Sequence, residues 1–275
     1  MNTGSRRKFM QSAALAFPAT ALALNSRSAG SSDAPAKPAT PVPPGTISEL
    51  FPTQPPELAR EMVLVSHFNL KRVKELVSAR PSLAKAAWDW GFGDWETALG
   101  AASHMGNRQI AEYLLTNGAH PSIFSAAMLG HLDAVKGFVA AQPGIQRTSG
   151  PHSISLLEHA KAGGVTAGGV YEYLASLGDA GAPPEPALSD EQRASILGTY
   201  IFGAGPTDQV EVSVQQGRLT WTRKGTIGRW IIHLGDRVFY ACGAPSTRIR
   251  FADESGGTVM TVSDPDVVLV AKLKA

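Results

Sequence analysis

Histidine is the side chain that most readily exchanges protons and binds metals near neutral pH, and the chain has seven. They are scattered along the sequence, with no His-Glu-x-x-His motif and no other paired spacing of histidine with carboxylate. The one cysteine, Cys242, can form neither an intramolecular disulfide nor a cysteine-based metal site. We therefore expect the histidines to hydrogen-bond within the scaffold, and we expect no metal. The histidines are His67, His104, His120, His131, His152, His159 and His233.

A second candidate for chemistry is Ser82 to Lys85, which has the Ser-x-x-Lys spacing of serine β-lactamases. The same spacing occurs at Ser5 to Lys8, and no Ser-Asp-Asn or Lys-Thr-Gly partner motif is present. Ser82 follows a proline, where it can cap the next helical turn. Gly-x-Ser-x-Gly is absent, and Gly203 to Gly205 lacks the rest of a dinucleotide fingerprint. We therefore expect no catalytic residues, no cofactor and no enzymatic activity.

The elements that position these residues begin with the stretch from Glu96 to Ser122, which resembles an ankyrin repeat. Thr97, Ala98 and Leu99 stand at the first three places of that family's Thr-Pro-Leu-His opening. Gly106 can take a positive φ and turn the chain back. An apolar stripe at helical spacing then follows. The later matching residues are Ala102, Gly106, Leu114, Leu115, Gly118 and Ala119.

Sliding this template along the chain predicts about four repeats between residues 57 and 180. The position that Ala102 occupies, where the repeat has a small residue, recurs at intervals of 38, 24 and 34 residues. The period of the family is about 33 residues. We interpret the short interval as a junction without its projecting hairpin and the long one as a junction with added residues. His131 follows a turn glycine, where the ankyrin pattern itself places histidine. The small-residue place is Leu64, Ala102, Ala126 and Ala160, and the turn place is Phe68, Gly106, Gly130 and Gly164.

The added residues of the long junction hold three of the five tryptophans. In ankyrin proteins the hairpin tips meet partners, and aromatic rings supply contact area at low entropic cost. The alternative is that the rings pack under the first repeat. We expect different rings to take each role: Trp95 should pack against the first repeat, and Trp90, at the tip, should contact a partner. The candidate binding residues are Trp88, Asp89, Trp90, Phe92 and Trp95.

The N-terminus resembles a twin-arginine signal peptide, with Arg6 and Arg7 as the arginine pair. A weakly apolar run follows to Leu24, too short to span a membrane comfortably, and small residues offer cleavage points before residue 30. Residues 1–30 are thus expected to direct export to the periplasm or exterior, with no stable membrane insertion after cleavage. Residues 31–56 are proline-rich and are expected to form an extended linker.

After a second linker at residues 181–188, the period of the sequence changes from helical to alternating. Ser189 can cap a short helix, and about eight short strands follow up to residue 275, which predicts an antiparallel β-barrel or β-sandwich. Cys242 lies on a strand-like run and is expected to be a buried thiol. A lipocalin-like cavity is one alternative for these strands. Its lining would be Trp221, Trp230, Phe239 and Tyr240, although core packing explains them as well.

Leu197 to Tyr200, a Val-x-Val sequence and Gly217 to Leu219 together resemble the small β domain of some serine β-lactamase-like hydrolases. The resemblance implies an accessory domain, because those hydrolases carry their chemistry in another domain that this chain lacks.

The sequence therefore predicts an α+β multidomain protein, an ankyrin-like helical solenoid at 57–180 followed by a β domain at 189–275. The net charge of +2 is dispersed, which argues against a nucleic-acid partner. We expect an exported, non-enzymatic protein that binds another protein through its repeats. The alternative is a small-molecule carrier or hydrolase-like enzyme with its site in the β domain or the interdomain cleft, and a purely structural envelope protein is a further alternative.

Overall fold

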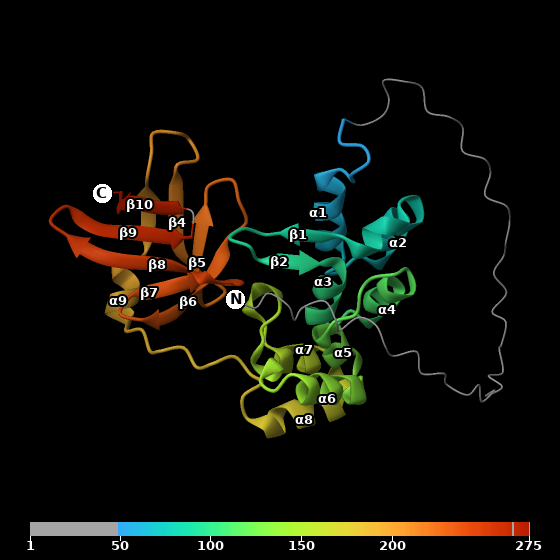
Figure 1. The fold of residues 1–275 in the computed structure, drawn as a ribbon. Helices are drawn as coiled ribbons and strands as arrows, with labels where there is room; N and C mark the ends of the chain where they lie inside the picture. The colour runs from blue at the N-terminus through green and yellow to red at the C-terminus, as the bar shows by residue number, and fades with distance from the viewer. Residues whose placement is uncertain (1–48, 266, 275) are drawn as a thin grey trace, which may run out of the picture. The chain divides into compact units, whose positions relative to one another are not determined.

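The computed structural model describes residues 49–265 and 267–274, and Glu49 onward forms one compact unit (Figure 1). The predicted signal peptide with Arg6 and Arg7, and the linker as far as Ser48, lie outside the described residues. Among the described residues, no helix combines the length and apolar character needed to cross a membrane.

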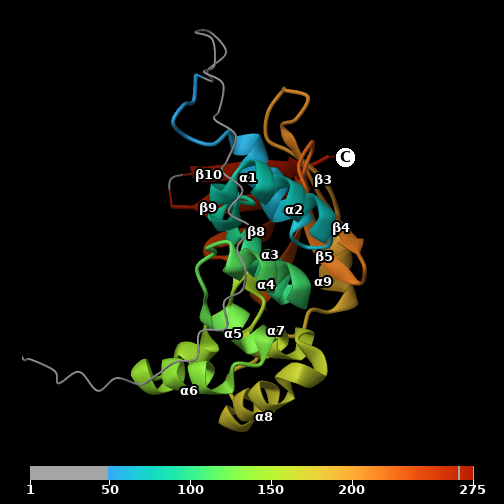
Figure 2. The same cartoon turned by 90° about the vertical axis from the view of Figure 1, so that its right-hand side faces the viewer.

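The first half of this unit consists of helices that follow one another in pairs (Figures 1 and 2). The two helices of each pair pack together, and the first helix of each pair also packs on the first helix of the next. The pairs are α1 (Pro56–Val65) with α2 (Leu70–Ala79), α3 (Ala98–His104) with α4 (Arg108–Thr116), α5 (Ile123–Leu129) with α6 (Leu132–Ala141), and α7 (Leu156–Ala162) with α8 (Gly168–Leu177).

Glycine turns the chain between helices at the places predicted from the sequence. Gly106, Gly130 and Gly164 have φ of +69°, +79° and +63°, a region that side chains with a Cβ rarely adopt. At Gly106 the added constraint is space, because a Cβ would lie 2.3 Å from the carbonyl oxygen of Ala162. Ala102 is fully buried, as its small-residue place predicts.

The connections between pairs differ in length as the repeat intervals predict. After α2 the chain forms the 3₁₀ helix η1 (Pro81–Lys85) and then a hairpin of β1 (Ala87–Asp89) and β2 (Trp95–Thr97). Between α4 and α5 the described chain forms no strand. The remaining 3₁₀ turns are η2 (Ile145–Arg147), η3 (Pro151–Ser153) and η4 (Gly164–Ala167).

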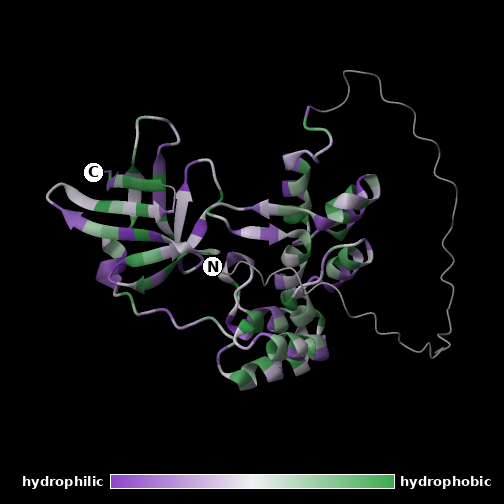
Figure 3. Cartoon of the chain, viewed as in Figure 1, coloured by the Kyte–Doolittle hydropathy of each residue, from purple (hydrophilic) through white to green (hydrophobic). Residues whose placement is uncertain are grey.

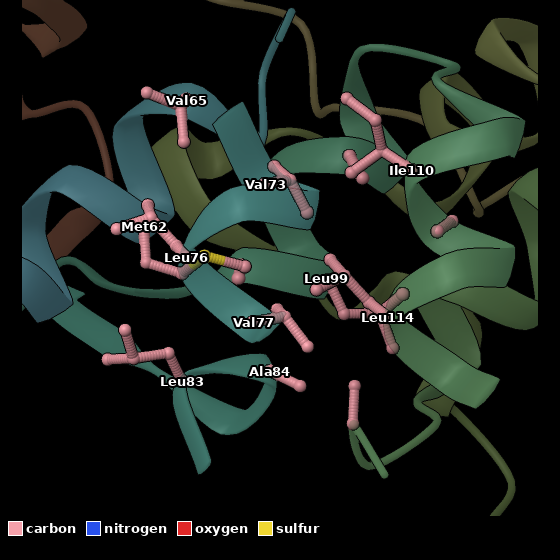
Figure 4. Close-up of a cluster of buried hydrophobic side chains, with 14 of the residues drawn as sticks. Met62, Val65, Val73, Leu76, Val77, Leu83, Ala84, Leu99, Ile110 and Leu114 are labelled. Atoms are coloured by element: carbon pink, nitrogen blue, oxygen red, sulfur yellow. The ribbon is translucent and has the colours of Figure 1, made fainter. Parts of the chain in front are cut away.

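Apolar faces of the helices meet in two buried clusters. One joins the first two pairs, η1 and the end of α5, and Figure 4 shows Met62, Leu99 and Leu114 among its side chains. The other joins the last two pairs, with Leu156 and Leu174 fully buried. A helix pair buries its apolar face only against a neighbour, so the pairs stabilise one another.

The second half is a closed antiparallel barrel of eight strands, which confirms the predicted antiparallel strands and selects a barrel over a sandwich. Its strand order is β10-β3-β4-β5-β6-β7-β8-β9, and β10 pairs with both β9 and β3. Along β4, inward positions alternate with outward ones, and Figure 3 shows the hydropathy of each residue along the strands. The strands are β3 (Gly198–Ile201), β4 (Gln209–Gln215), β5 (Arg218–Arg223), β6 (Arg229–Gly235), β7 (Val238–Ala241), β8 (Ala244–Glu254), β9 (Gly257–Asp264) and β10 (Val267–Leu273).

Helix α9 (Asp190–Ser195) precedes the barrel and begins with a capping box between Ser189 and Gln192, as predicted. Side chains fill the barrel core, Trp221 and Phe239 among them. Trp230 is instead 37% exposed and points away from that core into a pocket described below. The aromatic residues proposed to line a barrel cavity therefore divide between core packing and an outer surface.

Candidate functional site

The hairpin β1–β2 places two carboxylates on one buried face. Successive strand residues point to opposite sides, so Asp94 and Glu96 are buried while Trp95 between them is 65% exposed. Glu96 has no exposed surface, although it is acidic. A buried carboxylate requires hydrogen-bond donors or cations around it, and three histidines from other elements supply them.

Each of these histidines lies at the end of a helix or in a turn. His67 follows α1, and His104 is the last residue of α3. His152 lies in η3, the turn before α7, with a φ of +57°. The packing of α1 on α3 and of α3 on α7 brings the three turns to the hairpin.

The nitrogen atoms of these histidines converge on the carboxylate of Glu96. His104 Nε2 lies 2.9 Å from Glu96 Oε1, and His67 Nε2 and His152 Nε2 each lie 3.5 Å from Oε2. The Nε2 atoms of His67 and His104 are 3.2 Å apart. One donor atom from each of the four residues lies within 4.8 Å of all the others. We refer to these four residues as the His₃Glu cluster.

Further contacts fix the orientation of the cluster. His67 Nδ1 donates to the carbonyl oxygens of Leu64 and Val63 at 3.0 and 3.1 Å. His152 Nδ1 donates to Asp94 Oδ2 at 2.7 Å. The indole Nε1 of Trp90 donates to Glu96 Oε2 at 2.8 Å. With their Nδ1 atoms engaged, His67 and His152 turn Nε2 toward the centre of the cluster.

The barrel contributes the outer contacts of the cluster. Arg229, at the start of β6, donates to Asp94, to the carbonyl oxygen of Trp90 at 2.8 Å and to that of Cys242. The Cys242 thiol donates to the carbonyl oxygen of His152 at 2.6 Å. The position of His152 therefore depends on both halves of the unit.

Burial and charge act against each other on the ionisable groups. Burial disfavours the charge on Glu96, but the imidazoles of His104 and His152 outweigh burial and lower the pKa of Glu96 to about 2. Burial also disfavours a charged His152, but the carboxylates of Asp94 and Glu96 outweigh it and raise its pKa to about 9. Burial lowers the pKa of His67. At neutral pH the cluster thus holds an ionised carboxylate beside a protonated imidazole.

A pocket of about 700 Å³ opens beside the cluster, between the helices and the barrel. His67, His104 and His152 line it, whereas Glu96 does not. The other walls are largely apolar and come from both halves of the unit. They are formed by Leu64, Phe68, Trp90, Met105, Ile154, Ile227, Gly228, Arg229, Trp230 and Cys242.

The binding residues predicted from the sequence all lie on the hairpin or its tip, but they separate in space. Trp90 lines the pocket, and its predicted role as a contact for a partner stays a prediction. Phe92 packs edge-on against Trp221 of the barrel at 5.5 Å between ring centroids, and Asp89 accepts from the backbone nitrogen of Gly91. Trp88 is half-buried on β1. Trp95 is 65% exposed, so the prediction that it packs under the first repeat is wrong; strand alternation points it outward.

The His₃Glu cluster has no counterpart among the sites predicted from the sequence. The scaffold role expected for the histidines captures their hydrogen bonding but not their convergence on one carboxylate. One feature of the sequence indicated that two of the histidines lie near each other. Leu64 and Ala102 occupy equivalent positions in successive repeats, and His67 lies three residues after Leu64 while His104 lies two residues after Ala102. No sequence spacing connects these two with Glu96 or His152, because their proximity depends on helix packing. Cys242 is buried, as predicted, and burial raises its pKa.

Comparison with known proteins adds no assignment. Neither the protein-family models nor the curated proteins that were compared with the chain gave a match.

Proposed function

We propose that the protein binds a small molecule in the pocket between its helices and its barrel. The observation that carries the proposal is that largely apolar walls from both halves line an open pocket of about 700 Å³ beside a cluster of convergent polar groups. Ligand sites typically have volumes of about 300–1,000 Å³, lie between domains and combine apolar walls with a few placed polar groups. This is the interdomain-cleft alternative of the sequence analysis.

The lining defines the class of ligand. Phe68, Met105 and Ile227 are more than half exposed although they are large and apolar, and all three line the pocket. Trp90 and Trp230 add aromatic surface from opposite halves of the unit. A molecule with an apolar body and one polar head group matches these walls, with its head directed to the histidines.

Filling the pocket tests this proposal. Met105→Trp adds a large ring to the lining, and Val165→Trp is the matched control because Val165 is 99% exposed and lies outside the pocket. Binding of the dye 1-anilinonaphthalene-8-sulfonate, which has an apolar ring body and an anionic sulfonate, is followed by its fluorescence with the full chain. We expect Met105→Trp to weaken binding at least about tenfold, or about 1.4 kcal/mol, and Val165→Trp to leave it unchanged. Equal affinities of both variants and the wild type would contradict the proposal.

Partner binding is the second candidate function, and the exposed ring of Trp95 favours it. Under this proposal the protein is an exported, non-enzymatic ankyrin-repeat protein and its barrel is an accessory domain. The paired helices and turn glycines support the repeat assignment. Pull-down of the exported form from its own periplasm, with Trp95→Ala as the control bait, tests whether the protein binds a partner.

The periplasmic location is tested separately by cell fractionation of the double variant Arg6→Lys and Arg7→Lys. We expect this variant to stay in the cytoplasm.

A further inference from the structure

We propose that the His₃Glu cluster is a binding site for a divalent transition-metal ion such as Zn²⁺, with His67, His104, His152 and Glu96 as its ligands. The ligand set follows from the geometry of the cluster alone. Only the consequence drawn for the pocket rests on the proposed function.

Several distances within the cluster are close to the spacing of donor atoms around a metal. Zinc–nitrogen bonds of 2.0–2.1 Å at tetrahedral angles place neighbouring donor atoms about 3.3 Å apart. The two closest imidazole nitrogens, those of His67 and His104, are 3.2 Å apart. The contacts of Glu96 with the three histidines are 2.9 Å and twice 3.5 Å. The four donor atoms lie within 4.8 Å of one another, so the widest pair would have to close by up to about 1.5 Å around an ion. His152 would also release its Nε2 proton on binding the metal.

The outer contacts are those that hold metal ligands in place. A histidine ligand usually donates its second ring nitrogen to a carboxylate or a backbone carbonyl, which fixes the ring and its tautomer. His152 does so through Asp94, and His67 does so through Leu64 and Val63. Asp94 is itself held by Arg229, and Glu96 is held by Trp90. The same contacts would hold the two imidazole rings with Nε2 directed toward a bound ion.

The donor types select the class of metal. Three imidazoles and one carboxylate suit zinc, copper, nickel or iron. Calcium takes six to eight oxygen ligands and magnesium favours an octahedral oxygen shell, which this cluster does not offer. We therefore exclude the alkaline-earth ions.

An ion at this site would be reached from the pocket. The three histidines line the pocket, whereas Glu96 has no exposed surface. Four protein ligands complete a tetrahedral zinc site, so a group from the pocket would bind the ion either as a fifth ligand or in place of one of these four side chains. Combined with the proposed function, this assigns the head group of the pocket ligand: a metal-binding group such as a carboxylate.

Metal titration of the full chain tests the site. The protein is freed of metal with EDTA, the chelator is removed, and Zn²⁺ binding is measured by isothermal titration calorimetry. We expect one ion per chain at micromolar affinity or tighter. Because substitution of an outer-contact residue already weakens binding about 10–100-fold, we expect His104→Ala and Glu96→Gln to weaken it more than about 100-fold. His120→Ala and His131→Ala are matched controls on exposed histidines, and we expect them to bind Zn²⁺ as the wild type does.

Two further measurements keep the test decisive. If circular dichroism shows that Glu96→Gln does not fold, His67→Ala replaces it, because the His67 side chain is 17% exposed. Co²⁺ in place of Zn²⁺ should give visible absorption bands in the wild type that His104→Ala lacks. Failure of the wild type to bind one Zn²⁺, or equal losses in the exposed controls, would overturn the site. Dye binding to the metal-free protein tests the pocket separately, so each proposal fails by its own measurement.

Discussion

Glu96 is a fully buried carboxylate whose charge depends on the groups around it. Leaving such a group without a donor carries a large desolvation penalty. The side chains that stabilise its charge include three imidazoles and one indole. They are His67, His104, His152 and Trp90.

Trp90 and Trp95 are a matched pair for testing this dependence. Trp90→Phe removes the indole donor to Glu96, and we expect it to cost about 1–3 kcal/mol of unfolding free energy. Trp95→Phe alters a ring that is 65% exposed, so we expect a change within about 0.5 kcal/mol. Urea unfolding of the two variants side by side measures the difference. This order is the reverse of the sequence-based expectation, and a larger loss at Trp95 would restore that expectation.

His159 predicts how stability depends on pH. Burial chiefly lowers its pKa from 6.5 to about 4, and its side chain has no exposed surface. The unfolded chain therefore takes up a proton below pH 6.5 that the folded chain takes up only near pH 4. Folding stability falls as the pH drops through this window, by up to about 3 kcal/mol. The raised pKa of His152 contributes stability that is constant below pH 6.5 and is lost progressively as the pH rises from there to about 9.

The measurement compares metal-free wild type with His159→Gln, whose amide can still donate to the Ser155 carbonyl that His159 Nδ1 contacts at 2.9 Å. Urea unfolding is followed between pH 7 and pH 4.5. We expect the wild type to lose more stability across this range than the variant does. Parallel pH dependences would show that His159 is not the group responsible.

Individual roles of residues were only partly predictable from the sequence. The burial of Cys242 followed from its place on an alternating run. The burial of Asp94 and Glu96 did not, because charged residues beside a glycine-rich tip are ordinarily solvated. What buries them is the barrel on one side and the histidines on the other, and neither is local in sequence.

At the level of elements, the helix turns were predictable because glycine marks them. Gly106→Ala tests this reasoning, with Gly118→Ala as its control. Both glycines have positive φ, at +69° and +90°, but only Gly106 lacks room for a Cβ. We expect both variants to lose stability through backbone strain, more than about 1 kcal/mol each. We expect a further loss at Gly106, because the Ala162 carbonyl must move.

Thermal melting of the two glycine variants checks this. Equal melting temperatures would mean that close packing against α7 does not constrain the turn.

The hairpin β1–β2 shows which features of an element the sequence does not predict. The length of the junction predicted extra structure, and the glycines predicted a tight tip, but which ring faces outward depended on strand register that the sequence left open.

For the whole molecule, alternation and turn residues predicted about eight antiparallel strands, and closure of the barrel selected among the possible arrangements. The contact between barrel and helices was not predictable. Arg229 lies 135 residues from Asp94 in sequence, and one arginine at the start of a strand has no local signal for a distant partner. The pocket, the outer support of His152 and the proposed metal site all depend on that contact.

Arg229→Gln tests the contact. The arginine side chain is 9% exposed and Asp94 is 2% exposed, and removing one partner of a buried ion pair typically costs about 3–5 kcal/mol. We expect such a loss in the full chain. In a fragment from Ser189 to Ala275 the partners on the hairpin are missing and only Cys242 remains, so the same substitution should cost much less. The fragment itself should unfold cooperatively, because its strands pair only with one another.

Urea unfolding of four proteins, wild type and variant as full chain and as fragment, gives the comparison. Equal losses in both contexts would mean that Arg229 stabilises the barrel internally rather than its contact with the helices. A fragment without cooperative unfolding would mean that the barrel needs the helices to fold. If Arg229→Gln lowers stability in the full chain but not in the fragment, the full-length variant should also bind Zn²⁺ more weakly. The reason is that Asp94 then loses the cation that holds it against His152.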